Sequence, residues 1–120
     1  MQQLSDEQAI AVDNAVRRIT DILALDELIV AQVLGFDDDG ISEYLSGGVG
    51  VDGTDDVMVT RALELIELYT LLETLLSDDE SVRRWLNGVN TALGARPLEL
   101  IATPEGLHKV LAYARATVHR

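Results

Sequence analysis

The residues of this 120-residue chain that could take part in chemistry are carboxylates, two histidines and a glycine-rich segment, since cysteine is absent. Without cysteine there are no disulfides, thiolate nucleophiles or cysteine-ligated zinc ions. Two acidic clusters, Asp37–Asp39 with Glu43 and Asp52 with Asp55 and Asp56, carry oxygen ligands of the kind that Ca²⁺ and Mg²⁺ prefer. Neither cluster has EF-hand spacing, and we interpret both as acidic caps, which the helix dipole favours at helix starts.

The histidines and the glycines give no catalytic arrangement. His108 and His119 lie about three turns apart on one predicted helix, so one metal ion cannot bridge them. Gly48–Gly53 matches G-x-G-x-x-G, but a dinucleotide loop follows a strand, and the preceding segment 41–46 has a helical pattern. We interpret this segment as a flexible connector. No cofactor and no enzymatic activity are expected.

Charge is unevenly distributed along the chain. Residues 1–82 carry 19 acidic and 3 basic residues, a net charge of −16, whereas residues 83–120 carry 2 acidic and 6 basic residues, a net charge of +4. An acidic surface disfavours nucleic acid as a partner. The N-terminal residues lack the charged and apolar regions of a signal peptide, and no apolar run approaches the roughly 18 residues of a membrane span. We therefore expect a cytoplasmic protein with no membrane contact.

The elements that must hold these residues are helices throughout, which predicts an all-α fold. Apolar residues recur at helical spacing, and Ser5 with Gln8 and Ser77 with Glu80 predict two capping boxes. The predicted helices span residues 6–23, 27–34, 39–46, 55–76, 78–87, 97–102 and 104–118.

The predicted helix over 55–76 has more apolar surface than one neighbour would cover. We expect it to be central or to form a homodimer interface. The glycine-rich segment marks the boundary between an N-terminal helical region, 1–53, and a second region, 54–120, that holds the long helix and the C-terminal helices.

Residues 26–46 have the pattern of a degenerate helix-turn-helix, two short helices joined by a turn at Gly35. In a DNA-binding protein the second helix would present basic or amide side chains to the bases. Here that helix is acidic, so phosphate repulsion disfavours DNA binding.

The C-terminal third contains an ordered set of short motifs with nearly constant spacing. It closely resembles the toxin-binding domain of Xre/MbcA/ParS-type antitoxins, with the resemblance covering about residues 60–120, and residues 1–53 resemble the family's Xre-like N-terminal region only loosely. The motifs that carry the resemblance are Trp85-Leu86, Asn90, Leu93-Gly94, Arg96-Pro97-Leu98-Glu99-Leu100-Ile101 and Thr103-Pro104-Glu105-Gly106.

The resemblance implies the antitoxin of a type II toxin–antitoxin system, which neutralises a RES-type, NAD⁺-consuming toxin by obstructing its active site. Many such antitoxins also bind promoter DNA as dimers. For toxin contact we select the exposed face and the end of the last helix, with aliphatic area from Leu107 or Val118. Two alternatives stay open: an Xre-type transcriptional regulator, and an acidic decoy that inhibits a basic partner. The predicted toxin-binding residues are Arg96, Lys109, Arg115, His119 and Arg120.

Overall fold

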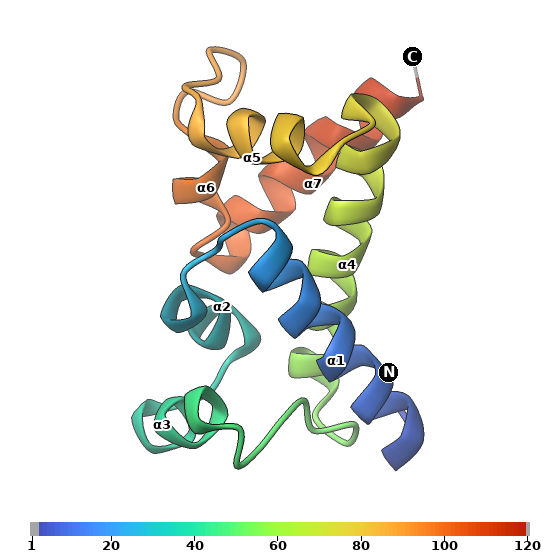
Figure 1. The fold of residues 1–120 in the computed structure, drawn as a ribbon, viewed down its shortest axis with the longest axis vertical. Helices are drawn as coiled ribbons and strands as arrows, with labels where there is room; N and C mark the ends of the chain where they lie inside the picture. Colours follow the sequence, from blue (N-terminus) through green and yellow to red (C-terminus); the bar gives the residue numbers. More distant parts are fainter. Residues whose placement is uncertain (1–2, 120) are drawn as a thin grey trace.

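A computed structural model describes residues 3–119, and over this range the chain forms seven helices and no strand (Figure 1). An antiparallel bridge between Asn90 and Ala95 stands alone among the described residues. The all-α prediction is confirmed. The helices are α1 (Asp6–Ile22), α2 (Glu27–Leu34), α3 (Asp38–Ser46), α4 (Asp56–Leu76), α5 (Asp79–Asn87), α6 (Pro97–Leu100) and α7 (Pro104–Val118).

Most helix ends use the capping residues that the sequence indicates. The Ser5 hydroxyl accepts a hydrogen bond from the Gln8 amide, and the Gln8 side chain accepts one from the Ser5 amide, which confirms the first capping box. Gly35 and Gly47 end α2 and α3 in the left-handed conformation, which glycine adopts without steric cost.

The second predicted capping box is wrong. Ser77 does not begin α5; it ends α4 with a φ of 73°. Asp78 begins α5 instead, and its carboxylate accepts a hydrogen bond from the Ser81 amide at 2.8 Å. A short acidic side chain serves this role as well as a hydroxyl does, and it interacts favourably with the helix dipole. The adjacent Ser and Asp made the register ambiguous in the sequence.

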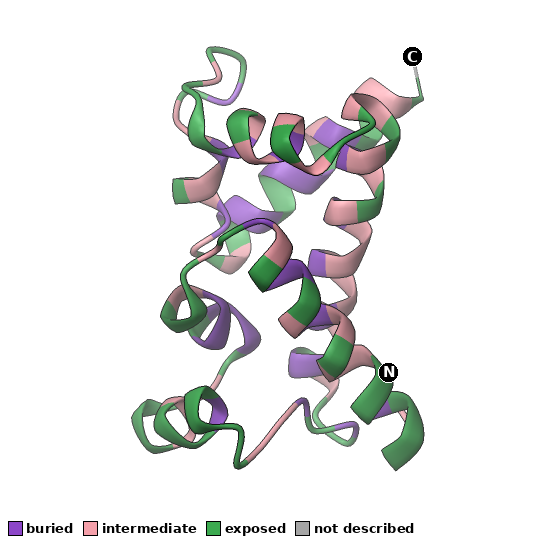
Figure 2. Ribbon diagram, viewed as in Figure 1, coloured by how far each residue is buried: buried purple, intermediate pink, exposed green. Residues whose placement is uncertain are grey.

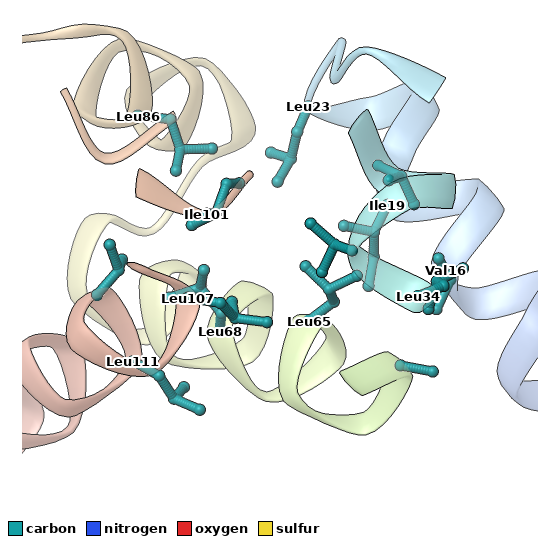
Figure 3. Close-up of a cluster of buried hydrophobic side chains, with 14 of the residues drawn as sticks. Val16, Ile19, Leu23, Leu34, Leu65, Leu68, Leu86, Ile101, Leu107 and Leu111 are labelled. Carbon is teal, nitrogen blue, oxygen red and sulfur yellow. The ribbon is translucent and has the colours of Figure 1, made fainter. Parts of the chain in front are cut away.

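Helix α4 is the central element of the fold. It packs against α1 and α2 with one part of its surface and against α5 and α7 with another. Leu65, Leu68 and Leu72 are buried, and Figure 3 shows the first two between side chains from both groups of helices. These contacts account for the apolar excess of α4. The homodimer therefore stays a prediction, as does the division of the chain at residue 53.

The glycine-rich loop between α3 and α4 is held against α1. Asp13 accepts a hydrogen bond from the Val51 amide at 3.1 Å. Arg17 donates to the carbonyl oxygens of Tyr44 and Val49 at 3.1 and 2.9 Å, and its guanidinium lies 3.9 Å from the centre of the Tyr44 ring. The loop is thus part of the packed structure, and its interpretation as a flexible connector is wrong.

No described helix is long and apolar enough to cross a membrane. The longest dimension of the molecule is 37 Å. Along it, the acidic helix α3 lies at one end and α5 with α7 lies near the other (Figure 1). The charge asymmetry of the sequence is therefore also an asymmetry in space.

Candidate functional site

Helix α7 carries most of the predicted site residues, and its start is well defined. The Thr103 hydroxyl accepts a hydrogen bond from the Gly106 amide at 3.1 Å, and Pro104 occupies the first turn. Gly106 lies directly against α6, because a Cβ at this position would collide with the Leu100 carbonyl oxygen. This close approach fixes α7 relative to α6.

One stripe of α7 is buried in the core. Leu107 has no exposed surface, so the prediction that it supplies apolar area to a partner is wrong. Its side chain packs in the interior with those of α4, as Figure 3 shows. Val118, near the end of the helix, is half-buried and stays a candidate. The buried members of the stripe are Gly106, Leu107, Val110, Leu111 and Ala114.

The predicted site residues separate into two groups. Lys109 and Arg96 adjoin the α5–α6 loop, residues 88–95: Lys109 donates to the Leu93 carbonyl oxygen, and Arg96 follows the loop directly. Arg115 and His119 lie further along α7, and ten residues separate Lys109 from His119, about 15 Å of helix. Arg120 lies outside the described residues.

The Arg115 group faces α4. Arg115 makes a two-pronged ion pair with Glu67, with its Nε and one terminal nitrogen 2.6 and 2.7 Å from the two carboxylate oxygens. These hydrogen bonds lower the pKa of Glu67 and raise that of Arg115. About two turns before it, His108 Nε2 lies 2.7 Å from a carboxylate oxygen of Glu64. This face of α7 is therefore already paired with α4.

Lys109 faces a different way. Its ammonium group donates a hydrogen bond to the Leu93 carbonyl oxygen at 2.8 Å, within the α5–α6 loop. Successive residues of a helix differ by about 100° around its axis, which separates Lys109 from the face that His108 and Arg115 share. Lys109 thus holds a loop, a role that its sequence position did not indicate.

Arg96 is paired locally. It lies 2.7 Å from Glu99, three residues later, and both side chains are well exposed. An exposed pair of this kind contributes little to stability, so Arg96 can exchange its partner at small cost.

A pair of aromatic rings on α5 and α7 adds a feature that the sequence analysis missed. Trp85 and Tyr113 stack with ring centres 6.3 Å apart, and both residues are half-buried. The sequence motifs include Trp85, but nothing in the spacing pointed to Tyr113 as its partner. The stacked rings couple the surface of α5 to that of α7.

The N-terminal helices give no comparable site. Helices α2 and α3 pack together around the turn at Gly35, but the exposed residues of α3 include Asp38, Asp39 and Glu43. The glycine-rich loop follows α3, so it lacks the preceding strand of a dinucleotide-binding loop. Within residues 3–119 no three histidine, aspartate or glutamate side chains converge as a metal site would require.

The comparisons with known proteins bear on the C-terminal helices. Residues 71–116 match the model of a protein family described as the antitoxin Xre/MbcA/ParS C-terminal toxin-binding domain. The matched range begins within α4 and takes in α5, α6 and most of α7. A search of the curated proteins found no match.

Proposed function

We propose that residues 71–116, which match the model of the antitoxin Xre/MbcA/ParS C-terminal toxin-binding domain, bind a RES-type toxin and neutralise it by obstructing the toxin's NAD⁺ site. A match to a toxin-binding domain supports a role as the antitoxin of a toxin–antitoxin system. The family match is the single observation that carries the proposal. The type of toxin and the mode of inhibition come from the resemblance of the C-terminal motifs.

The charge and exposure of the C-terminal helices support this proposal. Residues 83–120 carry a net charge of +4, in contrast to the rest of the chain. Arg115 and His119 are exposed, while the buried stripe of α7 fixes the helix beneath them. Basic side chains on a rigid helix suit a toxin surface that carries acidic groups.

Arg115 has to exchange one carboxylate for another in this complex. Its partner Glu67 is exposed to a similar degree, with side-chain exposures of 50% and 41% for the two residues. Because both side chains are about half exposed, water hydrates Glu67 when the pair separates, and a toxin carboxylate that approaches Arg115 in the same two-pronged way can take its place. Together with His119, this residue forms the basic contact that we propose, and Arg120, which lies outside the described residues, follows them in the chain.

The proposal is tested by co-expressing the chain with a candidate RES-domain toxin, purifying by a tag on the toxin, and measuring NAD⁺ consumption. We expect a stable complex in which NAD⁺ loss is suppressed. Toxin that purifies free and active in the presence of the folded chain would contradict the proposal.

Two charge-reversal variants test whether the toxin binds the α7 surface around Arg115. Arg115→Glu places a negative charge on the proposed contact, whereas Arg18→Glu makes the same change on an exposed residue of α1. We expect the first variant to weaken toxin binding at least about tenfold and the second to leave it unchanged. Equal effects of the two variants would show that net charge, and not the α7 surface, governs binding. Truncation at residue 112 is a poorer test, because it also removes Tyr113 and the buried Ala114.

A further inference from the structure

We propose that the α5–α6 loop, residues 88–95, is a preformed contact that places Val89 in an apolar depression of the toxin bordered by acidic groups, and that Lys109 is the positioning residue that holds this loop. The inference rests on the proposed function, because the loop lies within the toxin-binding domain at residues 71–116. It adds a second contact to that of the Arg115 group.

The loop is ordered by its own hydrogen bonds. The Asn90 amide donates to the Ala95 carbonyl oxygen at 3.1 Å, and the Gly94 amide donates to the Asn90 carbonyl oxygen at 2.9 Å. The Asn90 side chain accepts a further bond from the Leu93 amide at 3.2 Å. Gly94 has a φ of 80°, a conformation that favours glycine and closes the turn.

Two contacts attach this ordered loop to the rest of the domain. Leu93 is only 4% exposed, so its side chain anchors the loop in the core. Lys109, from α7, donates to the Leu93 carbonyl oxygen at 2.8 Å. Fixing a lysine side chain costs conformational entropy. Here the hydrogen bond that fixes it also orders a loop, which projects at one end of the molecule (Figure 1).

The ordered loop presents an apolar side chain to solvent. Val89 is 76% exposed, the most exposed of the large hydrophobic residues among the described part of the chain. Figure 2 shows most of the surrounding loop as exposed or partly exposed. A single exposed hydrophobic residue is ordinary on a protein surface. Here it lies on a loop that is already ordered, so binding through it would not incur the cost of ordering a flexible segment.

The distribution of charge in and around the loop indicates the chemistry of the toxin surface that it would contact. Residues 88–95 contain no charged residue, although a quarter of the chain is charged. Basic residues flank them: Arg84 precedes the loop, Arg96 follows it, and Lys109 lies beneath it. Protein interfaces are depleted of charge at their centre and polar at their rim. The complementary surface of the toxin is therefore apolar at its centre and acidic around it.

The contact is tested with Val89→Asp, measured by its affinity for the same RES-domain toxin. Because Val89 is exposed, we expect this variant to fold normally and to bind at least about tenfold more weakly. Val57→Asp is the matched control, since Val57 is 53% exposed at the start of α4, outside the matched range. Binding by Val89→Asp within about twofold of the unchanged chain would overturn the inference.

The role of Lys109 is tested in the free protein. Lys109→Met removes the donor to the loop, so we expect faster hydrogen exchange at the Leu93 and Gly94 amides together with weaker toxin binding. Lys109→Arg keeps a donor and should restore both. Weaker binding with unchanged exchange in Lys109→Met would show that the lysine contacts the toxin directly and would overturn the positioning role.

The two proposals fail in distinguishable ways. If the unchanged chain does not bind the RES-domain protein, the proposed function is wrong. If it binds and inhibits, and Val89→Asp does so equally well, the proposed function stands and only the loop contact is wrong.

Discussion

On each side of α4 a basic side chain donates hydrogen bonds to the backbone of a loop, but the two loops differ in how far they are packed into the fold. In the N-terminal helices, Arg17 donates to loop carbonyl oxygens of Tyr44 and Val49, and in the C-terminal helices Lys109 donates to that of Leu93. Arg17 lies against an aromatic ring and a carboxylate and draws its loop into the packed structure. Lys109 donates one hydrogen bond to its loop, which still projects from the molecule (Figure 1). Similar hydrogen bonds from a basic side chain can therefore either draw a loop into the packed structure, as those of Arg17 do, or order a loop that projects from it, as that of Lys109 does.

The largest expected effect compares two closely packed glycines. Gly106→Ala would drive a Cβ into the Leu100 carbonyl oxygen, a backbone atom that cannot move alone, whereas Gly50→Ala would meet the Asp13 carboxylate at 2.7 Å. A side-chain carboxylate can turn away. We expect Gly106→Ala to lower the free energy of unfolding by more than about 3 kcal/mol and Gly50→Ala by clearly less. Urea denaturation measures both, and equal losses would mean that the start of α7 and the glycine-rich loop are packed with equal rigidity.

Substitution of the two loop-binding basic residues, Arg17 and Lys109, should destabilise the fold to different extents. Arg17→Met removes the three hydrogen bonds that Arg17 donates to the Tyr44 and Val49 carbonyl oxygens and to the Asp13 carboxylate, so we expect a loss of about 2–3 kcal/mol in the free energy of unfolding. Lys109→Met removes one hydrogen bond at the surface and should cost about 0.5–1.5 kcal/mol. Thermal denaturation of both variants tests the order. A greater loss of unfolding free energy for Lys109→Met than for Arg17→Met would mean that the α5–α6 loop unfolds together with the core.

The helix caps allow a smaller test of the same difference. Thr103→Ala removes the cap of α7, a helix with five buried residues, and should lower the free energy of unfolding by about 1 kcal/mol. Asp37→Ala removes the cap of α3, in which only Tyr44 is buried. We expect α3 to fray locally, so hydrogen exchange in α3 should accelerate with little change in global stability. Global destabilisation equal to that of Thr103→Ala would contradict this view of α3.

The smallest expected effect concerns pH. The hydrogen bonds from Arg115 lower the pKa of Glu67 in the folded chain, so the pair stabilises the fold above the ordinary pKa of a glutamate. That contribution is lost as pH falls through the lowered pKa. The free energies of unfolding of the unchanged chain and of Glu67→Gln should therefore differ slightly near about pH 7 and converge near about pH 3. A difference that persists in acid would mean that Glu67 acts through packing and not through its charge.

Much of the fold could be predicted because local signals and packing agree. The Ser5 box, the Asp26 cap, the Gly35 and Gly47 ends and the Pro97 and Pro104 starts all act within a few residues of the chain. The Ser77 box failed because serine and aspartate stand side by side and either can cap a helix. The glycine-rich segment was misread because its order comes from Asp13 and Arg17, more than thirty residues away.

The site could be predicted only in part. Residue type indicated exposed basic side chains on α7, and the motifs indicated the family, which the match at residues 71–116 supports. Sequence spacing could not show that Leu107 points inward, that Arg115 is paired with Glu67 or that Lys109 holds the α5–α6 loop. Each of these facts depends on which neighbour the helix face meets.

The sequence by itself determined the helices, their caps, the acidic body and the basic C-terminal third, because propensity, capping and charge depend on residue type and near neighbours. The tertiary structure decided which basic side chains are paired within the chain and which loop projects from the fold in an ordered conformation. Those outcomes depend on contacts between Lys109 and Leu93 or Arg115 and Glu67, residues far apart in the chain. Only the packing of α7 against α4 and against the α5–α6 loop brings them together.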